Sequence, residues 1–144
     1  MDRQAIFNQV RAHLLSQHSR SVIIEAGALP QHRNGAVSAY RGFRNMACAI
    51  GAVIPDGVYH PNMEGTPIRR LIAEWPRIQR LFKVEGEEDI LFLEALQNVH
   101  DTIQPREWDQ YLAMTANRFK VEHPDKNLLF REQVREPNHS KRRQ

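Results

Sequence analysis

The chain has 144 residues, a length that fits a single domain with one hydrophobic core. Hydrophobic residues make up 41% and charged residues 26%, and no apolar run approaches the ~20 residues that cross a bilayer, which excludes a membrane-spanning protein. A single cysteine excludes an intramolecular disulfide and a cysteine-based metal cluster, and no secretory signal is visible, so we expect a cytoplasmic protein.

The net charge of +3 is unevenly distributed along the chain. Residues 1–119 hold 13 basic and 13 acidic residues, whereas residues 120–144 hold 7 and 4. We therefore predict a neutral compact domain over residues 1–119 and a flexible basic tail over residues 120–144. A field that attracts phosphate is confined to that tail, so nucleic-acid binding is expected only there, through Lys141, Arg142 and Arg143.

The first predicted element is a helix from a capping Asp2 to about Gln17. Apolar residues recur along it at helical spacing and form one stripe, made of Ile6, Val10 and Leu14. This helix is expected to pack its stripe against the rest of the domain.

A small β element is predicted next. Residues 22–24 form a short β-prone run, and residues 36–40 are expected to pair with residues 46–48 as a hairpin around Gly42, which tolerates a positive φ. The apolar run 48–54 is too short for periodicity to separate a buried strand from buried helix, and we favour helix.

Three further helices are predicted from their start and stop signals. Thr66 and Pro67 are typical of a helix start, three acids follow Gly86, and prolines mark the ends. The expected helices run from Thr66 to Trp75, from Glu87 to Ile103 and from Pro105 to Phe119. The fold class is therefore mainly α, with about four to five helices and one short β-hairpin.

Cys48, His100 and Asp101 are the candidate catalytic residues. A thiolate nucleophile needs an imidazole to take its proton, and the imidazole needs an orienting acceptor. Because neighbouring helix residues point about 100° apart, Asp56 or Glu64 is better placed than Asp101 as that acceptor. The alternative interpretation is structural: Cys48 is a small buried hydrophobe and His100 a histidine at the edge of the core.

A metal site is the weaker alternative for the His100–Asp101 pair. His60 with Asp109 or Asp125 would complete the ligands, but their spacing is poor, and the remaining histidines are expected to be solvated. Phosphate-loop and dinucleotide fingerprints are missing, so no cofactor or metal is expected.

The loop that carries Tyr59 and Met63 mixes an aromatic, a thioether and a carboxylate. Such a mixture suits a binding surface, and Tyr59 and Met63 are the candidate binding residues. It suits a structured connection equally well.

Three motifs form a recognisable pattern: C-A-I-G-x-x-I-P-D over residues 48–56, M-E-G over 63–65 and L-Q-x-x-H-D over 96–101. Over roughly residues 3–119 the chain resembles a group of small uncharacterised proteins of bacteriophages, prophages and bacteria. The resemblance implies a mobile-element context and no catalytic role.

Three functions follow from the sequence. The leading hypothesis is a phage-type accessory protein that binds a host or phage protein, with an anti-defence or host-modulating role. The alternatives are a cysteine-dependent hydrolase or transferase that uses Cys48 and His100, and nucleic-acid binding through the basic tail.

Overall fold

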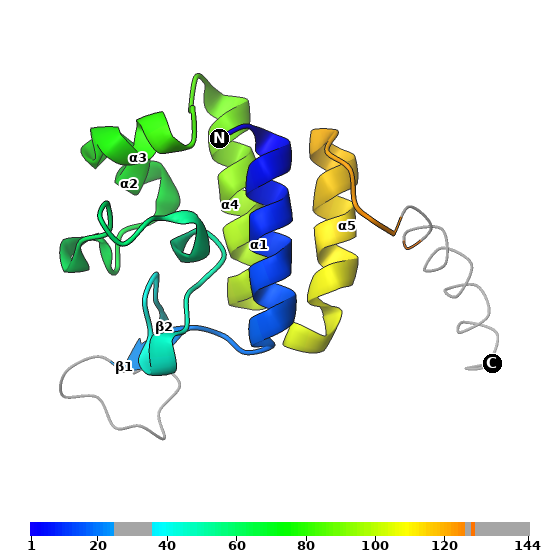
Figure 1. The fold of residues 1–144 in the computed structure, drawn as a ribbon, viewed down its shortest axis with the longest axis horizontal. Coiled ribbons are helices and arrows are strands. Elements are labelled where there is room, and N and C mark those ends of the chain that lie inside the picture. The colour runs from blue at the N-terminus through cyan, green and yellow to red at the C-terminus, as the bar shows by residue number, and fades with distance from the viewer. Residues whose placement is uncertain (25–35, 126–127, 129–144) are drawn as a thin grey trace.

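Three long helices packed side by side form the body of the protein (Figure 1). The computed structural model describes residues 1–24, 36–125 and 128. Helices α1 (Arg3–Gln17) and α4 (Glu87–Thr102) run in the same direction, and α5 (Trp108–Phe119) runs in the opposite one. Two shorter helices, α2 (Ile68–Glu74) and α3 (Pro76–Leu81), lie beside α4. The predicted mainly helical fold is confirmed within this part of the chain.

Helix α1 begins and ends where the sequence indicates. The carboxylate of Asp2 accepts a hydrogen bond from the Ala5 amide at 2.8 Å, which satisfies a backbone donor that the helix start leaves free. Its buried face carries the predicted stripe together with Phe7. The helix ends at His18, whose left-handed φ of 53° is typical of a C-cap.

The core lies between α1, α4 and α5 and continues into the irregular segment before α2 and under α2 and α3. Trp108 is fully buried at the start of α5, and its indole N–H donates to the Ile103 carbonyl at 3.0 Å. Phe92 of α4 and Phe119 of α5 meet edge to face with their ring centroids 5.4 Å apart. Helix α4 starts at the predicted Glu87 because three acids favour the positive end of the helix dipole.

Prolines set the boundaries of α2 and α3. Helix α2 starts at Ile68, one residue later than predicted, because Pro67 occupies the N-cap position that was expected for Thr66. Pro76 ends α2 and also opens α3, because its missing N–H and fixed φ suit the first position of a helix.

The predicted strand pairing was wrong. Strand β2 (Ala36–Ser38) pairs antiparallel with β1 (Val22–Ile24), with Val22 opposite Ser38, and residues 46–48 form no strand. The chain still reverses its direction near Gly42, whose amide donates to the Met46 carbonyl. The reversal contains a 3-10 turn at Phe43–Asn45 and is not a strand pair. Residues 25–35 lie outside the described residues, and the predicted hairpin is not shown.

The apolar run 48–54 is neither a strand nor an α-helix. It contains one buried 3-10 turn, η3 (Gly51–Val53), packed against α1. The Ile50 amide ahead of this turn donates to the side-chain oxygen of Gln97 at 3.1 Å. Helix α4 thus holds this irregular segment in place.

The packed region extends beyond the predicted domain end at Phe119. Gln4 exchanges two hydrogen bonds with the backbone of Glu122, at 2.7 and 2.9 Å. His123 is only 7% exposed, which corrects the expectation that it is solvated, because its Nε2 lies 2.6 Å from Asp109 of α5. The tail residues Lys141, Arg142 and Arg143 lie outside the described residues.

The contact between Asp109 and His123 predicts that the protein loses stability in acid. Burial raises the pKa of Asp109, but hydrogen bonds from Arg11 and His123 outweigh it, and the net shift is downward. A carboxylate whose pKa is lower in the folded than in the unfolded protein stabilises the fold at any pH above its unfolded-state pKa. This stabilisation is lost as the pH falls through the folded-state pKa. We expect the free energy of unfolding to fall as the pH drops below about 4, less steeply in Asp109→Asn than in wild type.

Urea titrations across that pH range measure this effect. Asp56→Asn is the matched control, because the Asp56 side chain is 93% exposed, and it should keep the wild-type slope. Equal slopes in Asp109→Asn and wild type would contradict the prediction.

Candidate functional site

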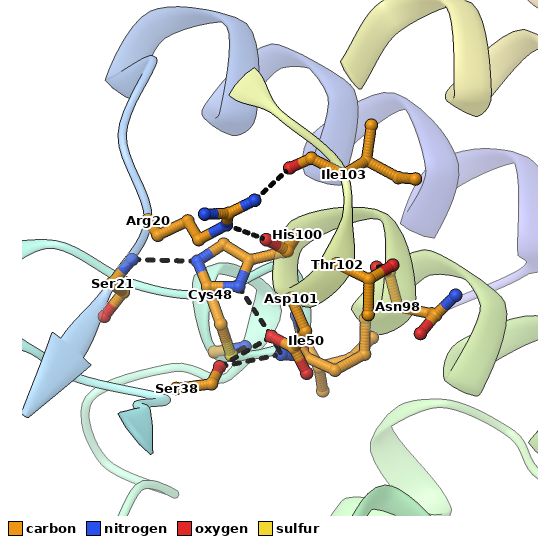
Figure 2. Close-up of polar contacts among 12 residues, drawn as sticks. Arg20, Ser21, Ser38, Cys48, Ile50, Asn98, His100, Asp101, Thr102 and Ile103 are labelled. Carbon is orange, nitrogen blue, oxygen red and sulfur yellow. Dashed lines mark hydrogen bonds and ion pairs between the residues drawn. The ribbon is translucent and has the colours of Figure 1, made fainter. Parts of the chain in front are cut away.

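His100 is fully buried near the end of α4, and both of its ring nitrogens are hydrogen-bonded (Figure 2). Nε2 accepts the backbone N–H of Ser21 at 2.8 Å, and Nδ1 lies 2.7 Å from Oδ1 of Asp101. Since a backbone amide can only donate, Nε2 carries the lone pair and Nδ1 carries the proton. The imidazole also stacks on Trp108 at a centroid distance of 5.7 Å.

Asp101 orients His100, contrary to the argument from helix geometry. Although the two residues are adjacent, Oδ1 of Asp101 accepts from the His100 ring, from Ser38 Oγ at 2.6 Å and from Gln97 Nε2 at 2.9 Å. The hydroxyl of Ser38, at the end of β2, donates its hydrogen bond from the sheet. The carboxylate therefore ties α4 to the sheet.

The end of α4 is tied to the start of β1 by Arg20. Its guanidinium donates to the carbonyls of His100 at 3.1 Å and Ile103 at 2.7 Å. These carbonyls have no partner inside the helix, so the arginine serves as a C-terminal cap.

Cys48 lies beneath this network as a buried thiol. It is 1% exposed, and its sulfur accepts the Gly51 amide at 3.3 Å. Burial raises the pKa of Cys48 to about 12, with Asp101 and Glu64 adding to the rise against hydrogen bonds from Gly51 and Gln97. At neutral pH the side chain is a thiol and not a thiolate nucleophile.

Neither Asp56 nor Glu64 takes the place of Asp101 at His100. Glu64 accepts the amides of Tyr40 and Arg41, both at 2.9 Å, and so fixes the segment after β2. Asp56 pairs with the Arg41 guanidinium at 2.7 Å on the surface. Both carboxylates therefore bind groups other than the imidazole.

The candidate binding residues of the loop belong to the framework. Met63 is fully buried, and the Tyr59 hydroxyl donates to Glu64 at 2.6 Å. His60 uses Nδ1 to accept the Asn62 amide within the same loop. The geometry favours the structured connection over a binding surface at these residues.

An open groove of about 530 Å³ lies over the Cys48–His100–Asp101 network. One wall is a row of polar residues on α4, spaced i, i+3, i+4 and i+7: Glu94, Gln97, Asn98 and Asp101. The opposite wall is the segment from Gly65 to Ile68 before and at the start of α2, and Ser38, Tyr40 and Cys48 complete the lining. The polar spacing on α4 was visible in the sequence, but its partner wall was not.

The groove has a negative character. Among the described residues that line it there is no lysine or arginine, whereas two are carboxylates, Asp101 and Glu94. Burial raises the pKa of Tyr40, and the charges of Glu64 and Asp101 raise it further. The same two carboxylates act on Cys48, so the local potential opposes any additional negative charge.

Comparison of the chain with models of protein families, with curated proteins and with solved structures finds no match. In the described part of the chain, no three His, Cys, Asp or Glu residues are grouped so that they could hold a metal ion. No helix in this part is both long and apolar enough to cross a membrane.

The buried thiol predicts slow chemical modification. In the native protein, Cys48 should react with a disulfide reagent such as Ellman's reagent at least about a hundredfold more slowly than in denaturant, because burial limits access and keeps the thiol protonated. Absorbance at fixed pH measures both rates. Comparable native and denatured rates would instead show an accessible, reactive cysteine.

Proposed function

We propose that this chain is a small accessory protein that acts by binding another protein, and that the groove over Asp101 is its binding surface. The observation that carries the proposal is the open groove between the polar side chains of α4 and the segment before α2. A cleft lined by polar groups at fixed positions, above a buried framework, is typical of a recognition site.

The chemistry around the groove favours binding over covalent catalysis. A cysteine nucleophile needs a free imidazole nitrogen to take its proton, but Nε2 of His100 already accepts the Ser21 amide. Protonation of Nε2 would break this buried hydrogen bond. The Cys48 thiol is also held in its neutral form by burial.

The distribution of apolar side chains supports the same surface. Among the described residues, Met114 on α5 is the one large hydrophobic residue that is exposed, at 48%. Isolated exposed apolar side chains are ordinary in monomeric proteins, so this residue does not indicate a second docking patch. The partner is accordingly expected to be recognised through polar and charged groups.

The context of this activity rests on the resemblance to small phage, prophage and bacterial proteins. It supports a partner of phage or host origin and a host-modulating or anti-defence role. The short chain and the absence of a phosphate-loop or dinucleotide motif fit an accessory factor of this kind.

A pair of matched substitutions tests the proposal. Asn98→Arg places a long side chain in the groove, whereas Asn117→Arg makes the same change at an exposed position on α5. We expect a specific partner, captured from the native host by the full chain, to bind wild type and Asn117→Arg equally. The Asn98→Arg variant should no longer bind this partner.

Circular dichroism must show that both variants remain folded. Equal capture by Asn98→Arg would place the binding surface elsewhere, and the absence of any specific partner for wild type would contradict the proposal as a whole.

A further inference from the structure

Among the described residues, no lysine or arginine pairs with the Asp101 carboxylate. Its Oδ1 accepts three hydrogen bonds, and each comes from a neutral group: Ser38, Gln97 and the neutral ring of His100. Within the described residues, Oδ2 takes part in no hydrogen bond, and the side chain is 34% exposed at the groove. The protein thus fixes one oxygen firmly and leaves the other available.

Other aspartates of the chain are treated differently. Each of three others forms an ion pair with an arginine, at 2.7 to 2.8 Å: Asp56, Asp89 and Asp109. Asp101 differs from these three in having no arginine partner among the described residues. Asp101 also lines the groove of about 530 Å³ described above.

Glu94 adds a second available oxygen on the same wall, two helical turns before Asp101. Its Oε1 accepts from Arg69 at 3.1 Å, but Arg69 is shared with Glu87, which it contacts at 2.6 Å. Oε2 of Glu94 forms no hydrogen bond within the described residues. The groove therefore presents carboxylate oxygens at two points along one wall.

The rest of the lining suits an extended, cationic chain. Pro67 is exposed and provides apolar surface against which an aliphatic stem can lie, and the buried Tyr40 and Ile68 support it at the edge of the groove. Asn98 and Thr66, on opposite walls, have side-chain polar atoms that make no hydrogen bond within the described residues. Such groups can bind the main chain of a peptide that passes between the walls.

We infer that the groove binds an arginine side chain presented by an extended segment of the partner protein, with the guanidinium placed at Oδ2 of Asp101. This inference rests on the proposed function and specifies its ligand chemistry. A planar guanidinium donates from several N–H groups at once and sheds its water more readily than an ammonium, so it matches a carboxylate beside apolar surface better than lysine does.

Two small probes test the inference on the full chain. N-acetyl-arginine N-methylamide carries the guanidinium, and the citrulline analogue has nearly the same shape without the charge. In ¹⁵N NMR titrations into the millimolar range, the arginine probe should shift groove amides saturably, those of Ser38, Thr66, Asn98 and Asp101. The citrulline probe should not shift them.

Substitution of Asp101 provides the control on charge. Asp101→Asn keeps an acceptor oxygen for His100 but removes the anion, so the arginine probe should bind at least about tenfold more weakly, a change of ~1.4 kcal/mol. Asp56→Asn, an equivalent change outside the groove, should bind as wild type does. Equal shifts from both probes, no shift from either, or unchanged affinity in Asp101→Asn would overturn the inference.

The two proposals fail separately. If Asn98→Arg no longer captures the partner and the arginine probe does not bind, the groove is still the protein-binding surface, but arginine recognition is rejected. If the arginine probe binds and Asn98→Arg still captures the partner in full, the groove is a guanidinium site, but the proposed protein-binding surface is rejected.

Discussion

Replacing Gly51 with alanine should destabilise the protein by at least about 3 kcal/mol, enough to unfold much of a marginally stable domain. An added Cβ would lie 2.2 Å from the carbonyl oxygen of Tyr40 and 2.8 Å from its carbonyl carbon. These backbone atoms belong to the peptide group whose N–H, that of Arg41, donates to Glu64 at 2.9 Å, so they cannot move as a flexible side chain would. The segment below the groove has to shift as a whole.

Gly57→Ala is the matched control for this substitution. An added Cβ there meets no atom within 4 Å, and its φ is not positive, so the expected effect is a slight stabilisation, below about 1 kcal/mol. Urea denaturation followed by circular dichroism measures both variants. If Gly51→Ala were as stable as Gly57→Ala, the close approach of η3 to Tyr40 would be contradicted.

His100→Ala should cost about 3 to 5 kcal/mol of folding free energy. The substitution leaves the buried Ser21 amide without an acceptor, removes a donor from Asp101 and opens a cavity beside Trp108. Hydrogen exchange of the Ser21 amide should accelerate in the same variant, because its protecting contact is gone.

His60→Ala separates this effect from the general loss of an imidazole. His60 is exposed and caps a short 3-10 turn, so its removal should cost no more than about 1 kcal/mol. A His100→Ala variant as stable as His60→Ala, with unchanged exchange at Ser21, would show that His100 does not hold β1 to α4.

Local chemistry made the helices predictable. Asp2, the acids after Gly86 and the prolines at 67, 76 and 105 act within a turn or two of their own position, so their effect can be inferred without a tertiary structure. The sheet register was not predictable in this way. Strand β2 pairs with β1, from which residues 25–35 separate it in the sequence. The local pattern instead favoured pairing with residues 46–48, which are nearer in the sequence.

The candidate site was predictable in its residues but not in its roles. The sequence singled out Cys48, His100 and Asp101. In the structure Asp101 binds the His100 ring, and Gln97 donates to Asp101 and also hydrogen-bonds to the Cys48 thiol. The role of His100 depends on Ser21, whose contribution is a backbone N–H that no side-chain pattern reveals. The groove likewise depends on Ser38 and the segment before α2, which tertiary packing brings to α4.

The central claim is that Cys48, His100 and Asp101 form a structural support for a binding groove and do not form a catalytic centre. The ¹⁵N chemical shifts of the His100 ring at neutral pH test this claim most directly, because they report which nitrogen carries the proton. The account predicts a neutral imidazole with the proton on Nδ1 and an unprotonated, hydrogen-bonded Nε2. A proton on Nε2, in either the other tautomer or the imidazolium, would contradict it.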